Sequence, residues 1–359
     1  MAFQASTGYN NLPNGKWSPV IYSKKAQVAF RKSSTVQDLV NSDYMGEIKQ
    51  FGDSVQIIKE PEIAVRSYAR GQQIVAQDLI DEDFTLTIDQ ANYFAFATDD
   101  IEKAQSHINW LDLATDRAGY KLRDHYDAEV LGYIAGYKPA APGSVATVPV
   151  VAADNPGTNA ISTAGVDELL TVNKLIKGSF GSITTAGAAD HSIPLAPRLP
   201  GATTVPTDVL SPLTLIARMG TRLDQQFVDT EGRWLVVDPV FMELLKDEDS
   251  RLFQAEWGES GALRNGLRIK NLHGFRVYVS NNLPKIGTGP ATTGAANQNT
   301  NFGVIIAGHN SAVAAAEQIS KVESFRSHDT FGDVVRGMHL YGRKKLRPEA
   351  IVTAKYNVA

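Results

Sequence analysis

The chain has 359 residues, of which 43% are hydrophobic, and its formal net charge at pH 7 is −4. This length and composition suffice for one large or two ordinary domains with buried cores. The near-neutral charge argues against a protein that binds nucleic acid regardless of sequence, because such binding needs an excess of Lys and Arg. Cysteine is absent, which excludes disulfides and thiolate metal sites. No apolar run approaches the roughly twenty residues that cross a bilayer.

Residues 1–45 are predicted to form an extended arm followed by a short helix. Residues 1–33 are rich in Asn, Ser, Gly and Lys, and their first part lacks the apolar segment of a signal peptide. Ser34 or Thr35 can cap a helix over Val36–Tyr44. A small basic run in the arm is either a solvated surface or a contact with acidic neighbours; its members include Lys24, Lys25 and Arg31.

Residues 46–82 are predicted to form a projecting β-hairpin loop. Strand-like segments cover Ser54–Ile58, Glu62–Ala69 and Asp83–Asp89, and the third alternates apolar with polar residues. Between the second and third segments, Gly71 breaks the run. A thin hairpin is only marginally stable without a partner surface. The loop therefore either folds back on its own domain or lies over a neighbouring subunit.

A helix of about ten turns is predicted over residues 99–137. Asp99 and Asp100 stand at its start as caps, and Gly136 ends it. Apolar residues recur at steps of three and four and trace one stripe, namely Ile101, Ala104, Ile108, Leu111, Ala118, Leu122, Val130 and Ile134. Most charged residues, Asp127 among them, are expected outside that stripe. No heptad seam persists, so a coiled coil is not expected.

The middle of the chain is predicted to alternate loops with a compact α+β domain. Residues 138–164 and 180–207 are small and polar, which is typical of surface excursions, and a helix is expected near Val166–Lys177. From Ser211 onward the pattern predicts a central sheet with helices. Ser211-Pro212 begins the first of these helices. The other expected elements are strands at Arg233–Val237, Leu267–Lys270, Phe275–Val279 and Phe302–Ala307, and helices at Val240–Lys246 and Ser311–Glu317.

Two closing strands are expected at Val334–Tyr341 and Ala350–Tyr356. We expect both to pair with Phe84–Phe96 and to pack beneath the long helix. That pairing would place the last part of the chain in the same domain as the helix.

The sequence displays no constellation of catalytic or metal-binding residues. The acidic residues at 78–83 lack the alternating ligands and the central glycine of an EF-hand. His107 and His125 would lie about 27 Å apart along one helix, too far to share a metal. Phosphate-binding loops, dinucleotide fingerprints and nucleophile elbows are not found. We therefore predict no catalytic, cofactor or metal site and no enzymatic activity.

Several short runs, in their order and spacing, resemble one protein family. They are Val65-Arg66-Ser67-Tyr68, Gln77-Asp78-Leu79, Leu86-Thr87-Ile88-Asp89-Gln90-Ala91, Tyr93-Phe94-Ala95-Phe96, Asp99-Asp100-Ile101-Glu102-Lys103-Ala104-Gln105, Gly274-Phe275-Arg276-Val277-Tyr278-Val279-Ser280-Asn281-Asn282-Leu283-Pro284, Tyr341-Gly342 and Arg347-Pro348-Glu349-Ala350. Together they resemble the major capsid proteins of tailed bacteriophages. The resemblance is nearest to the P22-type coat proteins, which share the HK97-like fold.

The resemblance implies an α+β, HK97-like capsid fold with four parts. These are an N-terminal arm and short helix (1–45), a projecting β-hairpin loop (46–82), a peripheral domain with the long helix (83–159 and 309–359) and an axial α+β domain (160–308). On this reading the expected intersubunit contacts are Arg66, Tyr68, Arg70, Lys24, Lys25 and Arg31.

The resemblance also implies a function and partners. We expect a major capsid protein that assembles in the host cytoplasm, through pentamers and hexamers, into the icosahedral head shell of the virion. The shell would enclose double-stranded DNA without sequence-specific binding, membrane or cofactor. Scaffolding and portal proteins would be its partners, and a decoration protein is a further candidate.

Two departures and two alternatives accompany this reading. P22-type coat proteins carry a large inserted domain, and Phe180–Thr207 is too short to be one. No Lys–Asn pair for covalent cross-linking is identified. An encapsulin-like shell around an enzyme cargo would share the fold, although its N-terminus is normally helical. A binding or hydrolytic protein of another class would require a deep pocket with perturbed titratable groups.

Overall fold

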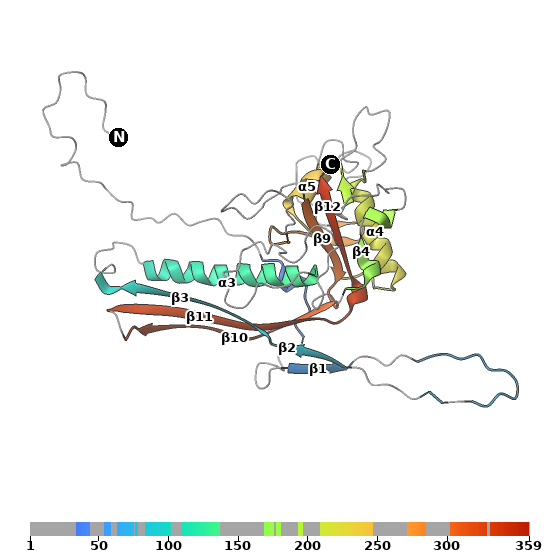
Figure 1. Ribbon diagram of the computed structural model, residues 1–359, viewed down its shortest axis with the longest axis horizontal. Helices are drawn as coiled ribbons and strands as arrows, with labels where there is room; N and C mark the ends of the chain where they lie inside the picture. Colours follow the sequence, from blue (N-terminus) through green and yellow to red (C-terminus); the bar gives the residue numbers. More distant parts are fainter. Residues whose placement is uncertain are drawn as a thin grey trace, which may run out of the picture.

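The computed structural model arranges three β-sheets around one long helix (Figure 1). It describes residues 34–43, 54–58, 63–74, 76–77, 83–101, 110–136, 169–175, 177–180, 193–196, 209–246, 271–284, 302–328 and 331–358. The expected arm at residues 1–33, the expected loop at 138–164 and the expected strand at Leu267–Lys270 lie outside these residues. Among the described helices, none is long and apolar enough to cross a membrane.

The first sheet has three antiparallel strands in the order β10 (Val313–Arg326), β11 (Gly332–Lys345) and β3 (Gln90–Asp99). The helix α3 (Trp110–Ile134) lies along one face of this sheet (Figure 1). In β3, half-buried and exposed residues alternate, as expected of a sheet with only one covered face. The β11–β3 pairing confirms the predicted partnership of Val334–Tyr341 with the strand that precedes the long helix.

The second sheet has seven short strands. Its main path runs β4 (Lys174–Leu175), β12 (Ile351–Val358), β9 (Phe302–His309), β6 (Arg233–Val237), β8 (Phe275–Val279) and β7 (Asn271–Leu272), and β5 (Ile193–Leu195) pairs with β12. Two helices accompany it, α4 (Pro212–Gln225) and α5 (Pro239–Lys246). Four short 3₁₀ turns complete the described elements, η1 (Val36–Asp38), η2 (Thr171–Asn173), η3 (Lys177–Phe180) and η5 (Pro348–Ala350).

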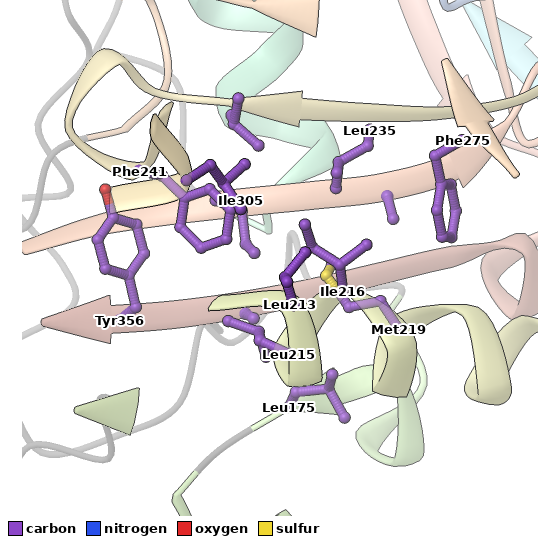
Figure 2. Close-up of a cluster of buried hydrophobic side chains, with 14 of the residues drawn as sticks. Leu175, Leu213, Leu215, Ile216, Met219, Leu235, Phe241, Phe275, Ile305 and Tyr356 are labelled. Atoms are coloured by element: carbon purple, nitrogen blue, oxygen red, sulfur yellow. The ribbon is translucent and has the colours of Figure 1, made fainter. Parts of the chain in front are cut away.

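Both faces of the seven-stranded sheet are buried, each by a different partner. On one face, Leu235 and Val237 of β6 pack with α4 and α5, in the core drawn in Figure 2. On the other face, Trp234 and Val236 pack with Val130 and neighbouring residues of α3. This two-sided burial explains why the residues of β6 after Arg233 are all apolar rather than alternating.

Most predicted elements of this region are confirmed. Strand β6 and helices α4 and α5 begin at or next to the residues that the sequence indicated. At the start of α5, the Asp238 carboxylate accepts the Phe241 N–H at 2.9 Å as a cap. The hairpin of β7 and β8 turns at His273 (φ 48°) and Gly274 (φ 83°). Positive φ at both central residues is the requirement of a type I′ turn, which glycine satisfies without strain.

The third sheet is a two-stranded ribbon of β1 (Ser54–Ile58) and β2 (Asp83–Thr87). Val55, Ile57 and Leu86 turn toward Ala314 and Ala316 of β10, and these residues form a small separate apolar cluster. The ribbon is therefore anchored at its base on the three-stranded sheet.

The predicted alanine-rich helix at Ser311–Glu317 is wrong, because residues from Val313 onward form strand β10. Alanine favours helices, but here its small size matters more: Ala314 and Ala316 are fully buried under the β1–β2 ribbon. Close packing against a second layer overrides the local propensity.

The predicted pairing of Ala350–Tyr356 with Phe84–Phe96 is also wrong. Strand β12 runs antiparallel to β9 and parallel to β4 and β5 in the other sheet. Its residues from Ile351 to Tyr356 are all buried. Such continuous burial requires two covered faces, which the seven-stranded sheet offers and the three-stranded sheet does not.

The predicted helices at Val166–Lys177 and Val36–Tyr44 are wrong in their described residues, which include short 3₁₀ turns and, at Lys174–Leu175, strand β4. In η2 the Asn173 amide donates to the carbonyl oxygens of Pro348 and Glu349 at 3.2 and 3.0 Å. These bonds hold η2 against η5, the turn that precedes β12. After η1 the chain turns away at Asn41, which forms a bridge with Ala314.

The start of the long helix differs in part from the prediction. Strand β3 extends to Asp99, and the Asp99 carboxylate accepts the Ile101 N–H at 3.0 Å, as a cap does. Asp100 pairs with Arg326 at 2.5 Å, and its expected role as a cap stays a prediction, because the residues that it would cap lie outside the described residues. Residues 102–109 lie outside the described residues, and the described helix has 25 residues.

A buried carboxylate on α3 joins three parts of the chain. The Asp127 Oδ1 atom accepts from the Ser34 hydroxyl at 2.9 Å and from the backbone N–H groups of Thr35 and Val36 at 2.9 and 3.0 Å. Its Oδ2 atom accepts from the Asn282 amide at 3.0 Å. Asp127 is fully buried, so its expected position outside the apolar stripe is wrong. Four donors compensate the loss of water around this charge.

Replacing Asp127 with Ala should lower the free energy of unfolding by about 3 kcal/mol or more, because several buried donors lose their acceptor. Chemical denaturation measures this loss. Amide exchange at Thr35 and Val36 should accelerate in the folded state. Asp124→Ala is the matched control, because Asp124 bonds only Asn282 among these donors and should leave that exchange unchanged. Equal exchange in Asp127→Ala and wild type would contradict the assigned role.

Gly342 should not tolerate a side chain. A Cβ atom there would lie 2.2 Å from the backbone oxygen of Thr87, where β2 crosses β11. Because a backbone atom cannot easily yield, Gly342→Ala should cost about 1–3 kcal/mol of unfolding free energy. Gly119→Ala on α3 meets nothing within 4 Å and should gain about 0.5–1 kcal/mol from helix propensity. Urea titration of both variants checks the opposite signs.

Candidate interaction surfaces

The most exposed feature of the described chain is the segment 63–74, here called the projecting loop. It extends from the β1–β2 ribbon well beyond the two larger sheets (Figure 1). All of its residues are exposed, including large apolar ones: Val65 is 97% exposed and Ile74 is 84% exposed. An apolar segment that its own chain does not cover is typical of an interaction site.

The shape of the projecting loop is set by glutamine side chains and one glycine. The Gln72 N–H donates to the Ala69 carbonyl at 2.9 Å, and the Ala69 N–H donates to the Gln72 side chain at 3.2 Å. Gly71 supplies the left-handed φ of 88° that this turn requires. Nearer the base, the Ala64 N–H donates to the Gln77 side chain at 3.0 Å. The predicted strand at Glu62–Ala69 is wrong over its described residues, because these side-chain bonds stand where a strand ladder was expected.

The projecting loop carries the predicted contact residues Arg66, Tyr68 and Arg70. All three are exposed, and residues 63–74 contain no acidic side chain. The loop therefore presents apolar and cationic groups together. Contact with another subunit stays a prediction for these residues. The other predicted contacts, Lys24, Lys25 and Arg31, lie outside the described residues.

A hollow of about 600 Å³ lies between α3 and the three-stranded sheet. It adjoins the buried contact of Asp127 with Ser34, Thr35, Val36 and Asn282, here called the Asp127 joint. Among its lining groups, the His339 ring lies 3.4 Å from the Glu317 carboxylate, and Ser34 donates to Asp127. Burial raises the pKa of the Tyr126 phenol, so the phenol stays protonated. Each of these polar groups connects elements of the fold, so we assign the hollow no chemistry.

The described residues contain no group of three or more side chains that could hold a metal ion. Three of the acidic residues considered for a cation, Asp78, Asp81 and Glu82, lie outside them. Two residues that organise the Asp127 joint, Asp127 and Asn282, were not singled out from the sequence. One signal in the sequence could have indicated that Asp127 faces the core. Asp127 lies three residues before Val130 and seven before Ile134, and both of these residues belong to the apolar stripe.

Comparison with known proteins identifies the family. A family model described as phage capsid protein matches residues 81–354. Among solved structures, one from Mycobacterium phage Che8 is 23% identical with a TM-score of 0.67, covering 95% of this chain and 98% of that chain. The capsid of Cyanophage P-SCSP1u is 18% identical with a TM-score of 0.61, covering 98% and 97%.

A third structure, the capsid of Ralstonia phage GP4, is 11% identical with a TM-score of 0.59 and covers 99% of both chains. A search of curated proteins gives no match. The solved structures, all under 25% identical, establish the fold over nearly the whole chain, and the family model matches more than half of it. The chain therefore belongs to the phage capsid protein family, as a structural capsid protein with the HK97-like α+β fold.

Proposed function

We propose that many copies of this chain close into the icosahedral head shell of a tailed phage around double-stranded DNA. The observation that supports this most strongly is the projecting loop, whose apolar residues its own chain leaves in water. A shell subunit needs such a surface, because its stability as a shell comes from contacts that exist only between copies. The membership of the chain in the phage capsid protein family supports the same proposal.

The parts of the subunit would divide the work as follows. The long helix and three-stranded sheet would form the peripheral domain, predicted at residues 83–159 and 309–359 and here limited to 83–159 and 309–350. Residues 160–308 would form the axial domain near the centres of pentamers and hexamers. Since β12 pairs within the seven-stranded sheet, we place residues 351–358 with the axial domain. Residues 1–45 and 46–82 would be the two arms that reach neighbouring subunits.

Charge supports a container for DNA. The formal net charge of −4 on 359 residues gives the wall little attraction for phosphates. A wall that released the duplex readily would suit a shell that is filled and later emptied. We further propose assembly in the host cytoplasm with scaffolding and portal proteins, and a place near the P22-type coat proteins. A decoration protein is a candidate partner for the exposed outer surface.

Electron microscopy of the recombinant chain, expressed alone and with its genomic neighbours, tests this function. Shells, tubes, pentamers or hexamers are expected after size-exclusion chromatography. A monodisperse monomer or dimer under every condition, including with a scaffolding protein, would contradict the proposal. Shells that consistently enclose one enzyme and no DNA would favour the encapsulin-like alternative.

Polar replacement of the loop should separate folding from assembly. The triple variant Val65→Ser, Tyr68→Ser and Ile74→Ser alters only exposed side chains, so the unfolding free energy should stay within about 0.5 kcal/mol of wild type. Assembly, followed by light scattering, should need a protein concentration at least about tenfold higher, because the apolar contact area is lost. Ser67→Ala on the same loop is the control. Unchanged assembly of the triple variant would show that the loop carries little of the contact energy.

A further inference from the structure

Helix α4 ends in a Schellman motif with an unusual residue at its left-handed position. The Val228 N–H donates to the Leu223 carbonyl and the Phe227 N–H donates to the Asp224 carbonyl, both at 3.1 Å. Phe227 has a φ of 58°. Glycine is the usual residue at this position, because a Cβ atom is strained in the left-handed region. A phenylalanine here makes the folded chain less stable than a glycine would.

The Phe227 side chain does not stabilise its own subunit by packing. It is 97% exposed, so it buries almost no apolar area in the folded chain. Strain and exposure of this kind mark positions where function, rather than folding, selects the residue. Val228, the next residue, packs against the apolar core, and it provides the contact that normally closes the motif.

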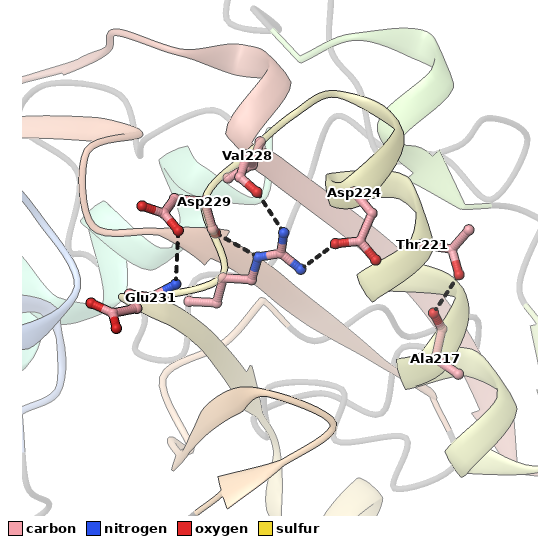
Figure 3. A network of polar contacts seen from close by, with 7 residues as sticks. Ala217, Thr221, Asp224, Val228, Asp229 and Glu231 are labelled. Atoms are coloured by element: carbon pink, nitrogen blue, oxygen red, sulfur yellow. Dashed lines mark hydrogen bonds and ion pairs between the residues drawn. The ribbon is translucent and has the colours of Figure 1, made fainter.

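The loop that carries Phe227 is held in place by the buried Arg233, whose bonds to Asp224, Val228 and Asp229 are the dashed lines at those labels in Figure 3. The Arg233 guanidinium donates to the backbone carbonyls of Asp229 at 2.7 Å and Val228 at 2.6 Å, and it pairs with the Asp224 carboxylate at 2.8 Å. On the helix side, the side-chain amides of Gln226 and Asn173 exchange two hydrogen bonds, at 2.8 and 2.9 Å. Phe227 is thus presented on a preorganised platform, which reduces the entropy lost on binding.

The Gln226–Asn173 bonds bring a second exposed apolar segment to this platform. Val172, beside Asn173, is 56% exposed, and Leu170 is also exposed. The carboxylates of Asp229 and Glu231 are exposed on the Phe227 loop itself. We call Leu170, Val172, Phe227, Asp229 and Glu231 the Phe227 patch. Apolar groups with charged groups at the margin are the usual composition of a protein–protein contact.

We propose that the Phe227 patch is a docking site for a second copy of this chain, and that the projecting loop of that copy occupies it. The argument for this occupant is complementarity. Val65, Tyr68 and Ile74 of the loop would contact the apolar residues of the patch. Arg66 and Arg70 would pair with the carboxylates of the patch, and residues 63–74 contain no acidic residue that would repel them. The inference rests on the proposed assembly of copies, and it adds the surface that receives the loop.

Replacing Phe227 with Gly should move folding and assembly in opposite directions. Relief of strain should shift the unfolding equilibrium about fivefold toward the folded state, measured by urea titration of the unassembled chain. Assembly under conditions that give wild-type shells should require about tenfold more protein, because the anchor is lost. Phe227→Trp, which keeps an aromatic anchor, should assemble within about twofold of wild type. Phe227→Asn, another residue that tolerates the left-handed region, should behave as Phe227→Gly.

Charge reversal tests the occupant. Asp229→Lys with Glu231→Lys, and separately Arg66→Glu with Arg70→Glu, should each impair assembly, while a mixture of the two variant chains should assemble better than either alone. Impairment without such rescue would overturn the loop as occupant. If Phe227→Gly assembles like wild type, the docking site itself is overturned. Failure of wild type to assemble with every partner is a different result, because it overturns the proposed function instead.

Discussion

The buried carboxylate of Asp127 is the interaction on which the arrangement of the domains depends. It receives donors from the start of the described chain, at Ser34, Thr35 and Val36, and from Asn282 beside the seven-stranded sheet. An isolated charge in this position would be prohibitively costly to bury. The three segments therefore stabilise the joint only when all are present, and their relative placement is tightly defined. A subunit that must fit many identical neighbours needs a joint of this kind.

The two larger sheets differ in burial, and that difference accounts for both the successes and the errors of sequence interpretation. Alternation in β2 and the capping and turn residues around α4, β6 and α5 were visible locally, so those elements were predicted. The Ala-rich start of β10 and the partner of β12 were not, because each depends on a layer distant in sequence. Ala314 is strand because the ribbon lies on it. The segment at Ile351–Tyr356 is buried throughout because both of its faces are covered. Its local pattern, which includes Thr353 and Lys355, could not assign it to a particular sheet.

The candidate surfaces were predicted only in part, for a related reason. The exposure of Arg66, Tyr68 and Arg70 could be expected because Gly71 interrupts the segment that carries them, whereas their contact with another subunit stays a prediction. Phe227 had no comparable signal in the sequence: an aromatic residue two positions after a helix end is ordinary until its φ and exposure are known. Asp127 likewise resembled any helical acid. Its role lies in donors that are 91 to 93 residues earlier in the chain, and in Asn282, 155 residues later.

The subunit withholds part of its apolar surface from its own core. Val65 and Ile74 on the projecting loop, and Phe227 on its rigid platform, are almost fully exposed, whereas the cores on both sides of β6 are fully buried. Burying these side chains within one chain would stabilise the monomer and leave less to gain on association. Leaving them in water makes each monomer less stable but lets every added neighbour remove apolar area from water. In the proposed assembly each copy both donates a loop and offers a patch, so the same small gain would recur at every contact, and a closed array of copies would be much more stable than any pair.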